Sequence, residues 1–219
     1  MKFFFGSITW VACLMLFMSA KSQEVQKWNK YSVTRSIHTS DLNYKKLFHG
    51  RSKAALENNI ADFYLYKNGM LVKPPDTAGA REFFAAGCLC FKFEDTLLLN
   101  SGLGRKAGVG VGIKIYRDKF SGSLHAKSGE NSAYKIKQTD STYTSDITVS
   151  PTSQSLKLYQ TPTFSDDETI IGEYNATFKK FYQRTKNKDE LRNYTVRLIF
   201  KCKVTSMDGF KEIAPPSGK

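Results

Sequence analysis

Residues suited to acid–base or metal chemistry are few in this chain of 219 residues, and they are scattered. His125 is the only histidine in the strand-rich part, since His38 and His49 belong to the N-terminal part. The acids Glu94-Asp95 and Asp166-Asp167-Glu168 fall in or beside expected turns, where carboxylates usually serve hydrogen bonding and solvation. A triad or metal cluster would have to be assembled from distant segments. The sequence therefore predicts no catalytic residue, no metal and no cofactor.

Cysteine is the next candidate for chemistry. Three cysteines lie beyond residue 22, namely Cys88, Cys90 and Cys202, and an odd number allows at most one internal bridge. Cys88 and Cys90 are two apart in an expected strand, so they share a face and are poorly placed to bond each other. Cys202 lies on the apolar face of the last expected strand. We expect structural cysteines, either simply buried or joined by one bridge from Cys202 to Cys88 or Cys90, because the spacing lacks the usual Cys-x-x-Cys form of zinc sites.

A glycine-rich run from Gly102 to Gly112 could suggest a phosphate-binding loop. Such a loop needs a strand before it and a helix after it, so that backbone N–H groups converge on the phosphates. This run instead leads into Val109, Val111 and Ile113 at alternating positions, which predicts a strand. Its glycines then share the other face, where a neighbouring backbone, a bulky side chain or a ligand comes close. We favour packing as their role.

The clearest charged surface is expected on the outward face of the last long hairpin. It comprises Lys179, Arg184, Lys186, Lys188, Arg197, Lys201 and Lys203. Aromatic residues that could stack on bases, such as Tyr174 and Phe200, fall on the opposite face, which disfavours a nucleic-acid partner. Two interpretations stay open. The lysines protect a solvated sheet edge, or they bind an acidic glycan, lipopolysaccharide, a membrane surface or an envelope protein.

The hairpin that positions these cations is expected over residues 169–205. Apolar residues alternate with mostly polar ones along both arms, as in half-buried strands. The apolar set is Ile170, Gly172, Tyr174, Ala176 and Phe178, then Tyr194, Val196, Leu198, Phe200, Cys202 and Val204. Residues 183–193 between the arms are predicted to form a polar loop. Burying each large apolar side chain contributes roughly 1.5–3 kcal/mol, so the hairpin needs a second layer to cover it.

Earlier segments also predict strands. Asn68-Gly69 predicts a tight type I′ turn between two short strands. Further strands are expected within residues 83–99, 109–115, 120–127, 133–138, 142–149 and 155–160, with a turn at Pro151-Thr152-Ser153. Helix signals are confined to two short stretches, one beginning at Ser40 or Asp41 and one at Ser52.

The N-terminus indicates the compartment. Lys2 is followed by an apolar run to Met18 and then by small or polar residues, the layout of a secretory signal peptide spanning residues 1–22. We therefore predict a secreted or periplasmic protein with no transmembrane span after cleavage. The formal net charge of +13 favours acidic partners, although such a charge also serves solubility.

Two stretches resemble small exported β-sandwich proteins of Bacteroidota. They are Phe63-x-Leu65-x-x-Asn68-Gly69 and the run from Ile171 to Phe178, which reads Ile-Gly-Glu-Tyr-Asn-Ala-Thr-Phe. The function of that group is largely unassigned, so the resemblance implies a fold and no active-site residue. Separately, the triplet Asp76-Thr77-Ala78 resembles the Asp-Thr-apolar sites that Bacteroidota glycosylate on exported proteins, which implies O-glycosylation of Thr77.

Together these patterns predict an all-β protein, an antiparallel β-sandwich with a short helical N-terminal segment. A lipocalin-like β-barrel is the alternative. The expected organisation is a signal peptide over 1–22, an arm with short helices over 23–60, the sandwich over 61–205 and a flexible tail over 206–219. We expect a non-enzymatic envelope protein that acts as a binding or structural module. The alternatives are a carrier of a hydrophobic ligand in a barrel interior and, less favoured, a secreted enzyme.

Overall fold

The computed structural model describes residues 27–37, 59–72, 87–104, 107–129, 133–186 and 188–206. These residues form strands and no helix, which confirms the all-β class. The strands are β1 (Asn29–Lys30), β2 (Ser32–Val33), β3 (Asn59–Lys67), β4 (Met70–Leu71), β5 (Cys88–Phe93), β6 (Thr96–Leu103), β7 (Gly108–Tyr116), β8 (Lys119–Lys127), β9 (Tyr134–Lys135), β10 (Asp146–Val149), β11 (Pro151–Leu158), β12 (Thr169–Phe178), β13 (Phe181–Thr185), β14 (Lys188–Arg192) and β15 (Tyr194–Ser206).

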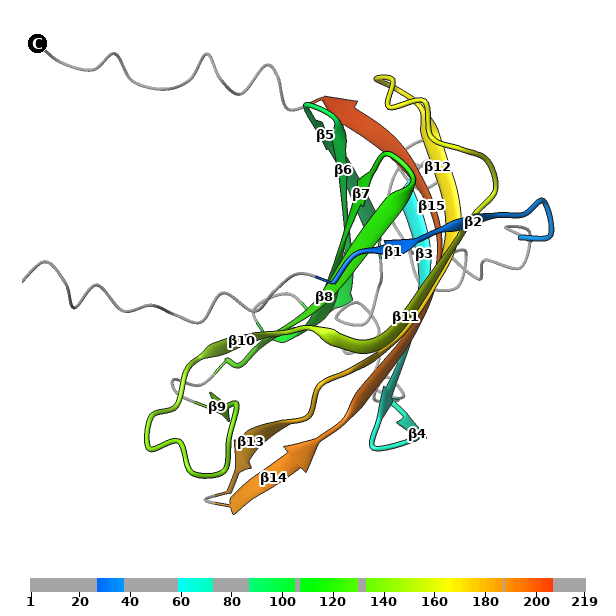
Figure 1. Ribbon diagram of the computed structural model, residues 1–219. Coiled ribbons are helices and arrows are strands. Elements are labelled where there is room, and N and C mark those ends of the chain that lie inside the picture. Colours follow the sequence, from blue (N-terminus) through cyan, green and yellow to red (C-terminus); the bar gives the residue numbers. More distant parts are fainter. Residues whose placement is uncertain are drawn as a thin grey trace, which may run out of the picture.

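Two walls of strands face each other (Figure 1). The first wall contains β5, β6, β7 and β8, with β1 and β10 pairing β8. The second wall contains β3, β15, β12 and β11, with β2 at its edge. The strand β15 joins the walls, because it pairs antiparallel with β3 up to Cys202 and then parallel with β5 from Val204 to Ser206. A separate three-stranded sheet, β14-β13-β9, lies at the lower end.

The arrangement is sandwich-like, and the walls are not closed into a barrel. The barrel alternative is therefore wrong. The purely antiparallel sandwich is also too simple, since β15 with β5 and β2 with β11 are parallel pairs. The predicted turn at residues 151–153 is wrong as well. Only Ser150 separates β10 from β11, so the chain passes directly from the first wall to the second, and Pro151 begins β11 opposite Phe178.

The core lies between the walls, and the predicted alternation along β12 and β15 is confirmed. Every second residue of both strands is buried, and the exposed fraction of Leu198, Phe200 and Cys202 is 0%. The ring of Phe120 in β8 meets Tyr174 of β12 edge-on, with centroids 6.2 Å apart. Gly122 is required below this contact, because a Cβ there would lie 2.0 Å from the Tyr174 hydroxyl. The interior between the walls is thus filled by side chains.

The segment between the arms of the last hairpin is not the loop predicted over residues 183–193. It folds into the β13–β14 hairpin, which pairs with β9. The alternation of apolar and polar residues did not predict these strands, because they have few apolar side chains. Hydrogen bonds between polar side chains stabilise them instead. Arg192 is buried and donates from Nε to Gln183 Oε1 at 2.9 Å and from Nη2 to Thr185 Oγ1 at 3.1 Å. Phe181 is the apolar anchor, 5.7 Å from Tyr134 and 5.6 Å from Tyr194 between ring centroids.

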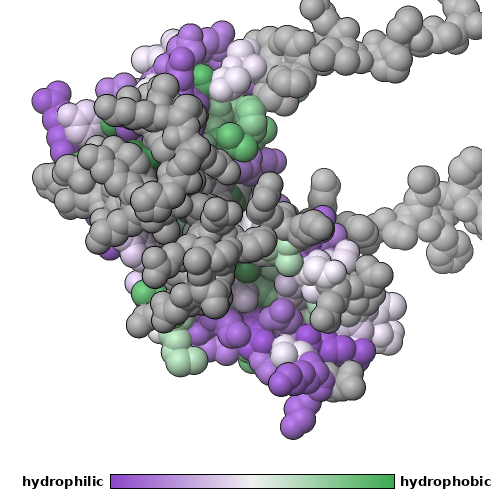
Figure 2. Space-filling view, turned by 180° about the vertical axis from the view of Figure 1, so that it is seen from behind, coloured by the Kyte–Doolittle hydropathy of each residue, from purple (hydrophilic) through white to green (hydrophobic). Residues whose placement is uncertain are grey.

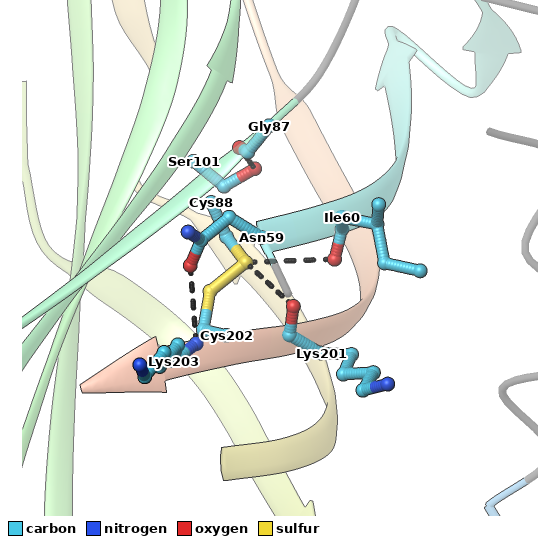
Figure 3. The surroundings of a disulfide bond; sticks show 8 residues. All are labelled: Asn59, Ile60, Gly87, Cys88, Ser101, Lys201, Cys202 and Lys203. Atoms are coloured by element: carbon cyan, nitrogen blue, oxygen red, sulfur yellow. Dashed lines mark hydrogen bonds between the residues drawn. A yellow bond between two sulfur atoms is a disulfide. The ribbon is translucent and has the colours of Figure 1, made fainter. Parts of the chain in front are cut away.

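A disulfide joins Cys88 of β5 to Cys202 of β15, with Cα atoms 5.8 Å apart (Figure 3). One of the two predicted pairings is thereby confirmed. The side chain of Asn59 lies beside it and accepts from the Lys203 N–H at 3.0 Å. Cys90 is the alternative that the structure rejects. It is a buried free thiol, and burial, with a smaller contribution from Glu168, raises the pKa of Cys90 to about 12, so it is unreactive.

Several predictions concern residues outside the described ranges. These are the signal peptide over 1–22, the helices beginning near Ser40 and Ser52, the modification site Thr77 and the tail after Ser206. Within the arm, residues 29–33 form β1 and β2, which bridge the front of both walls (Figure 1). The predicted Asn68-Gly69 turn is confirmed, since both residues have positive φ, 51° and 83°.

Candidate functional site

The seven predicted cations do not form one surface. Arg197, Lys201 and Lys203 lie along β15, whereas Lys186 and Lys188 lie at the turn of the β13–β14 hairpin. On β15 two of these three cations, Arg197 and Lys203, are matched by acids of neighbouring segments. Arg197 Nε donates to Glu173 Oε1 at 2.9 Å, and Lys203 Nζ lies 2.8 Å from Asp167 Oδ1. The outward face of β15 therefore serves largely as a cross-strand ion-pair surface.

Aromatic rings do lie beside this face, contrary to the sequence argument. Tyr64 of β3 is paired in register with Arg197, whose guanidinium lies 5.9 Å from the centre of that ring. The alternation along β15 could predict the direction of aromatic side chains within that strand only, and these point inward. A neighbouring strand supplies the outward one, because β3 and β15 are far apart in the sequence but adjacent in the sheet.

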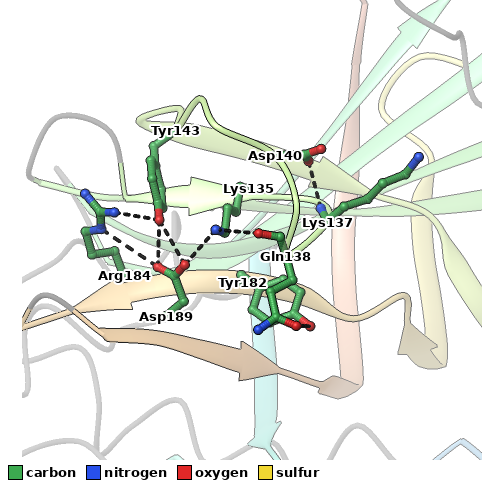
Figure 4. Close-up of polar contacts among 8 residues, drawn as sticks. All are labelled: Lys135, Lys137, Gln138, Asp140, Tyr143, Tyr182, Arg184 and Asp189. Carbon is green, nitrogen blue, oxygen red and sulfur yellow. Dashed lines mark hydrogen bonds and ion pairs between the residues drawn. The ribbon is translucent and has the colours of Figure 1, made fainter.

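Arg184 belongs to a polar network around Asp189 (Figure 4). Lys135 is buried and places its Nζ 2.6 Å from Asp189 Oδ2, while Tyr143 donates to the same carboxylate at 2.9 Å. Arg184 Nη2 in turn donates to the Tyr143 hydroxyl at 2.6 Å. The hydrogen bond to Asp189 raises the pKa of Lys135 above its ordinary value. A nucleophilic lysine needs a lowered pKa, so Lys135 does not suit that role. The contacts of the network instead hold the three-stranded sheet in place.

The first wall carries a second polar surface, on the outward faces of β6, β7, β8 and β10. Gly112 of β7 is paired with Asn100 of β6 on one side and with Ser123 of β8 on the other. The next row contains Gly110 and His125, with His125 also paired with Thr148 of β10. Glycines thus form a floor without side chains between rows of polar residues. We call these six residues the polar centre.

Hydrogen bonds order the polar centre. His125 Nε2 lies 2.9 Å from Ser123 Oγ, and His125 Nδ1 lies 2.9 Å from Thr148 Oγ1. A Cβ atom on Gly112 would lie 3.3 Å from Asn100 Oδ1 and 3.4 Å from both His125 Nε2 and Ser123 Oγ. Polar tips from two strands therefore converge above one glycine. This glycine leaves room for them, whereas Gly102 and Gly108 are needed because a Cβ at either position would lie within 3.0 Å of neighbouring backbone atoms.

Two hollows meet at the polar centre. One has a volume of about 850 Å³ and the other about 1170 Å³, and Asn100, His125 and Thr148 line both. The larger hollow, which we call the lysine groove, is lined by six lysines and two aspartates. These are Lys27, Lys114, Lys135, Lys137, Lys179 and Lys180, with Asp140 and Asp146. Only Lys179 among them was in the predicted basic surface.

Charge in the lysine groove is less balanced than on β15. Lys135 is paired with Asp189, but within the described part of the chain no ion pair involves Lys114 or Lys180. Both side chains are exposed. Partial burial lowers the pKa of His125 below its ordinary value of 6.5, so the imidazole is neutral at pH 7. The groove therefore offers ammonium groups around a neutral hydrogen-bonding centre.

The row Ser123, His125, Thr148 has the order of a nucleophile, a base and an orienting residue. A catalytic triad requires an acid at the third position, because the carboxylate stabilises the imidazolium that forms. Thr148 supplies a hydroxyl instead. Ser123 also lies within the regular β7–β8 ladder, where backbone N–H groups are committed to pairing rather than to an oxyanion. The arrangement suits hydrogen bonding to a bound polar group better than acyl transfer.

Sequence reasoning placed His125 on an outward face and did not bring it together with Asn100 or Thr148.

No three residues of the metal-binding types form a metal cluster in the described ranges. The described segments contain no helix that is long and apolar enough to cross a membrane. Comparison with models of known protein families, with curated proteins and with solved structures found no significant match.

Proposed function

We propose that this protein is an exported, non-enzymatic binding module of the cell envelope that holds an anionic glycan in the lysine groove. The observation that carries the proposal is the excess of lysines over acids around a glycine-floored polar centre. Carbohydrate ligands present hydroxyl groups, which neutral imidazole, amide and hydroxyl groups bind through hydrogen bonds. Their carboxylate, sulfate or phosphate groups would pair with the exposed ammonium groups.

The filled interior disfavours the alternative of a hydrophobic-ligand carrier. A carrier of that kind needs an apolar cavity between the walls. Here Phe120, Tyr174 and Phe200 are fully buried and occupy that space. The glycan groove instead uses outward residues of the first wall. The signal-like N-terminus and the resemblance to exported Bacteroidota proteins support an envelope location.

The test is titration calorimetry of the mature chain with dextran sulfate, polygalacturonate and lipopolysaccharide, at low and moderate salt, with neutral dextran for comparison. We expect salt-dependent binding to the anionic ligands alone. Lys114→Glu/Lys180→Glu should weaken it about tenfold, because each reversal removes an exposed attraction of the order of 0.2–1 kcal/mol and adds a repulsion.

The matched control is Lys186→Glu/Lys188→Glu, which changes the net charge equally but lies at the β13–β14 turn. It should bind the lipid-free ligands dextran sulfate and polygalacturonate as the wild type does. Equal loss in both variants would reduce the effect to net charge, and absence of salt-dependent binding would refute the proposal.

A hydrolase is the second candidate, and the Ser123–His125 contact of 2.9 Å is the observation that favours it. An activated serine reacts covalently with a fluorophosphonate. Mass spectrometry of the treated chain should find Ser123 unmodified if the groove only binds. Labelling of Ser123 that disappears in His125→Gln would instead establish the hydrolase.

A further inference from the structure

The β3–β4 turn is fixed to the junction between β14 and β15 at the lower end of the molecule. The Asn68 N–H donates to the Asn193 carbonyl at 2.8 Å, and the Asn193 N–H donates back to Asn68 Oδ1 at 2.8 Å. Asn68 Nδ2 also donates to the Leu191 carbonyl at 3.3 Å. These three hydrogen bonds hold the β3–β4 turn against the end of β14. The β3–β4 turn and the C-terminal end of β14 therefore lie side by side and form one surface.

Apolar side chains are exposed on this surface. The exposed fraction is 71% for Met70, 42% for Leu71 and 42% for Leu191, and Met70 is the most exposed large apolar residue in the described part of the chain. Figure 2 shows apolar side chains beside strongly hydrophilic ones at the lower end. Apolar residues exposed together where a turn is fixed against the end of a strand indicate a contact with something apolar.

Cations flank these residues. Lys67 is paired in register with Met70, and Lys186 and Lys188 lie at the β13–β14 turn, at the opposite end of β14 from Asn193. The acids of this end are already engaged, because Asp189 bonds Lys135 and Tyr143 while Glu190 pairs with Arg192. Among the described residues no ion pair involves Lys67, Lys186 or Lys188. The end thus combines an apolar tip with unmatched positive charge.

We propose that this end, the lysine-flanked tip, docks on an anionic lipid surface. Met70, Leu71 and Leu191 would enter the boundary between headgroups and acyl chains, and the three lysines would pair with headgroup phosphates. Interfacial anchors of proteins combine apolar insertion with basic residues in this way. A protein partner is a poorer fit, since three apolar side chains are far fewer than the ~20–30 residues a side of a stable interface.

The experiment is co-sedimentation of the mature chain with vesicles of phosphatidylcholine, with and without phosphatidylglycerol. We expect binding to the anionic vesicles that weakens with salt. Met70→Ser/Leu71→Ser/Leu191→Ser should lower the partition coefficient at least about tenfold, and Lys186→Glu/Lys188→Glu by a similar factor, at ~1 kcal/mol for each cation near the surface. Val33→Ser/Leu89→Ser is the matched control, because Val33 and Leu89 are also exposed, at 51% and 56%.

Four outcomes would overturn the proposal. One is no binding to anionic vesicles, and another is equal binding to neutral ones. A third is equal loss in the control variant. The last is a dimer in solution, without vesicles, that the triple serine variant dissociates, since a second copy would then cover the tip. Lys114→Glu/Lys180→Glu should leave vesicle binding unchanged, which separates this result from the fate of the glycan proposal.

Discussion

The outward faces of the two walls both carry cations, yet they differ in what lies beside each charge. On β15, Arg197 and Lys203 meet Glu173 and Asp167 within 3 Å. On the first wall, Lys114 neighbours Ser121 and Leu98 in the adjacent strands, and neither can neutralise it. An acid within reach on an adjacent strand or loop, and not only the residue in register, therefore decides whether a cation is available to a ligand. Counting cations along one strand cannot show this.

The largest effect is expected from breaking the covalent link between the walls. Cys88→Ala/Cys202→Ala removes a bridge that spans 114 residues. Closing a loop of this order stabilises a protein by roughly 4–5 kcal/mol in the chain-entropy account, and measured losses are about 2–5 kcal/mol. The free energy of unfolding from urea denaturation should fall by that amount. Cys90→Ala, which removes a buried thiol outside the bridge, should cost about 1 kcal/mol, and a double variant no worse than this control would contradict the expectation.

The next effect separates the two kinds of glycine on the first wall. Gly102→Ala places a Cβ 2.7 Å from Gly110 Cα and should cost about 1–3 kcal/mol through backbone strain. Gly112→Ala meets only side-chain tips at 3.3–3.4 Å and should leave stability within about 1 kcal/mol, since alanine suits a strand interior better than glycine. Glycan binding should nevertheless fall in Gly112→Ala. Thermal unfolding and calorimetry on both variants test this, and equal stability losses would contradict the distinction.

The fold was predictable where one strand carries its own signal. Alternation along β12 and β15 identified their buried faces, and Asn68-Gly69 identified a turn. Strands that are stabilised mainly by hydrogen bonds between polar side chains could not be predicted from apolar alternation. In β13 and β14, Arg192 is buried through hydrogen bonds to Gln183 and Thr185, so their composition resembles a loop.

The candidate site was less predictable than the fold because it depends on register. Ser123 and His125 could be placed on one face from their spacing of two residues. Asn100 and Thr148 join them only through the pairing of β6 with β7 and of β10 with β8. A shift of one residue in either pairing would turn these side chains to the other face. No local pattern fixes that pairing, so the polar centre became visible only in the structure.

A smaller effect is expected on the paired face of β15. Burial alone would raise the pKa of Glu173, but hydrogen bonds from Arg197 and Asn175 hold it below its ordinary value. The side chain of Arg197 is 49% exposed, so solvent screens the pair and its coupling should be about 0.5 kcal/mol. A double-mutant cycle with Arg197→Met and Glu173→Gln measures this coupling energy. A value near 3 kcal/mol would show that solvent does not screen the ion pair.

The smallest effect concerns His125 and distinguishes the polar centre by its pH dependence. The pKa of His125 is lowered by partial burial, so the folded state favours the neutral imidazole. This contribution to stability is fully present above the ordinary pKa of 6.5 and is lost as the pH falls through the lower folded value. Glu173 and Asp189, whose pKa values are lowered from 4.5 and 3.8, act only at more acidic pH. Thermal unfolding should therefore show a decline as the pH falls below about 6.5 in the wild type. The decline should be smaller in His125→Gln, whose amide can still bond Ser123 and Thr148. Parallel curves for the two proteins would mean that the imidazole is as well solvated in the folded state as in the unfolded state.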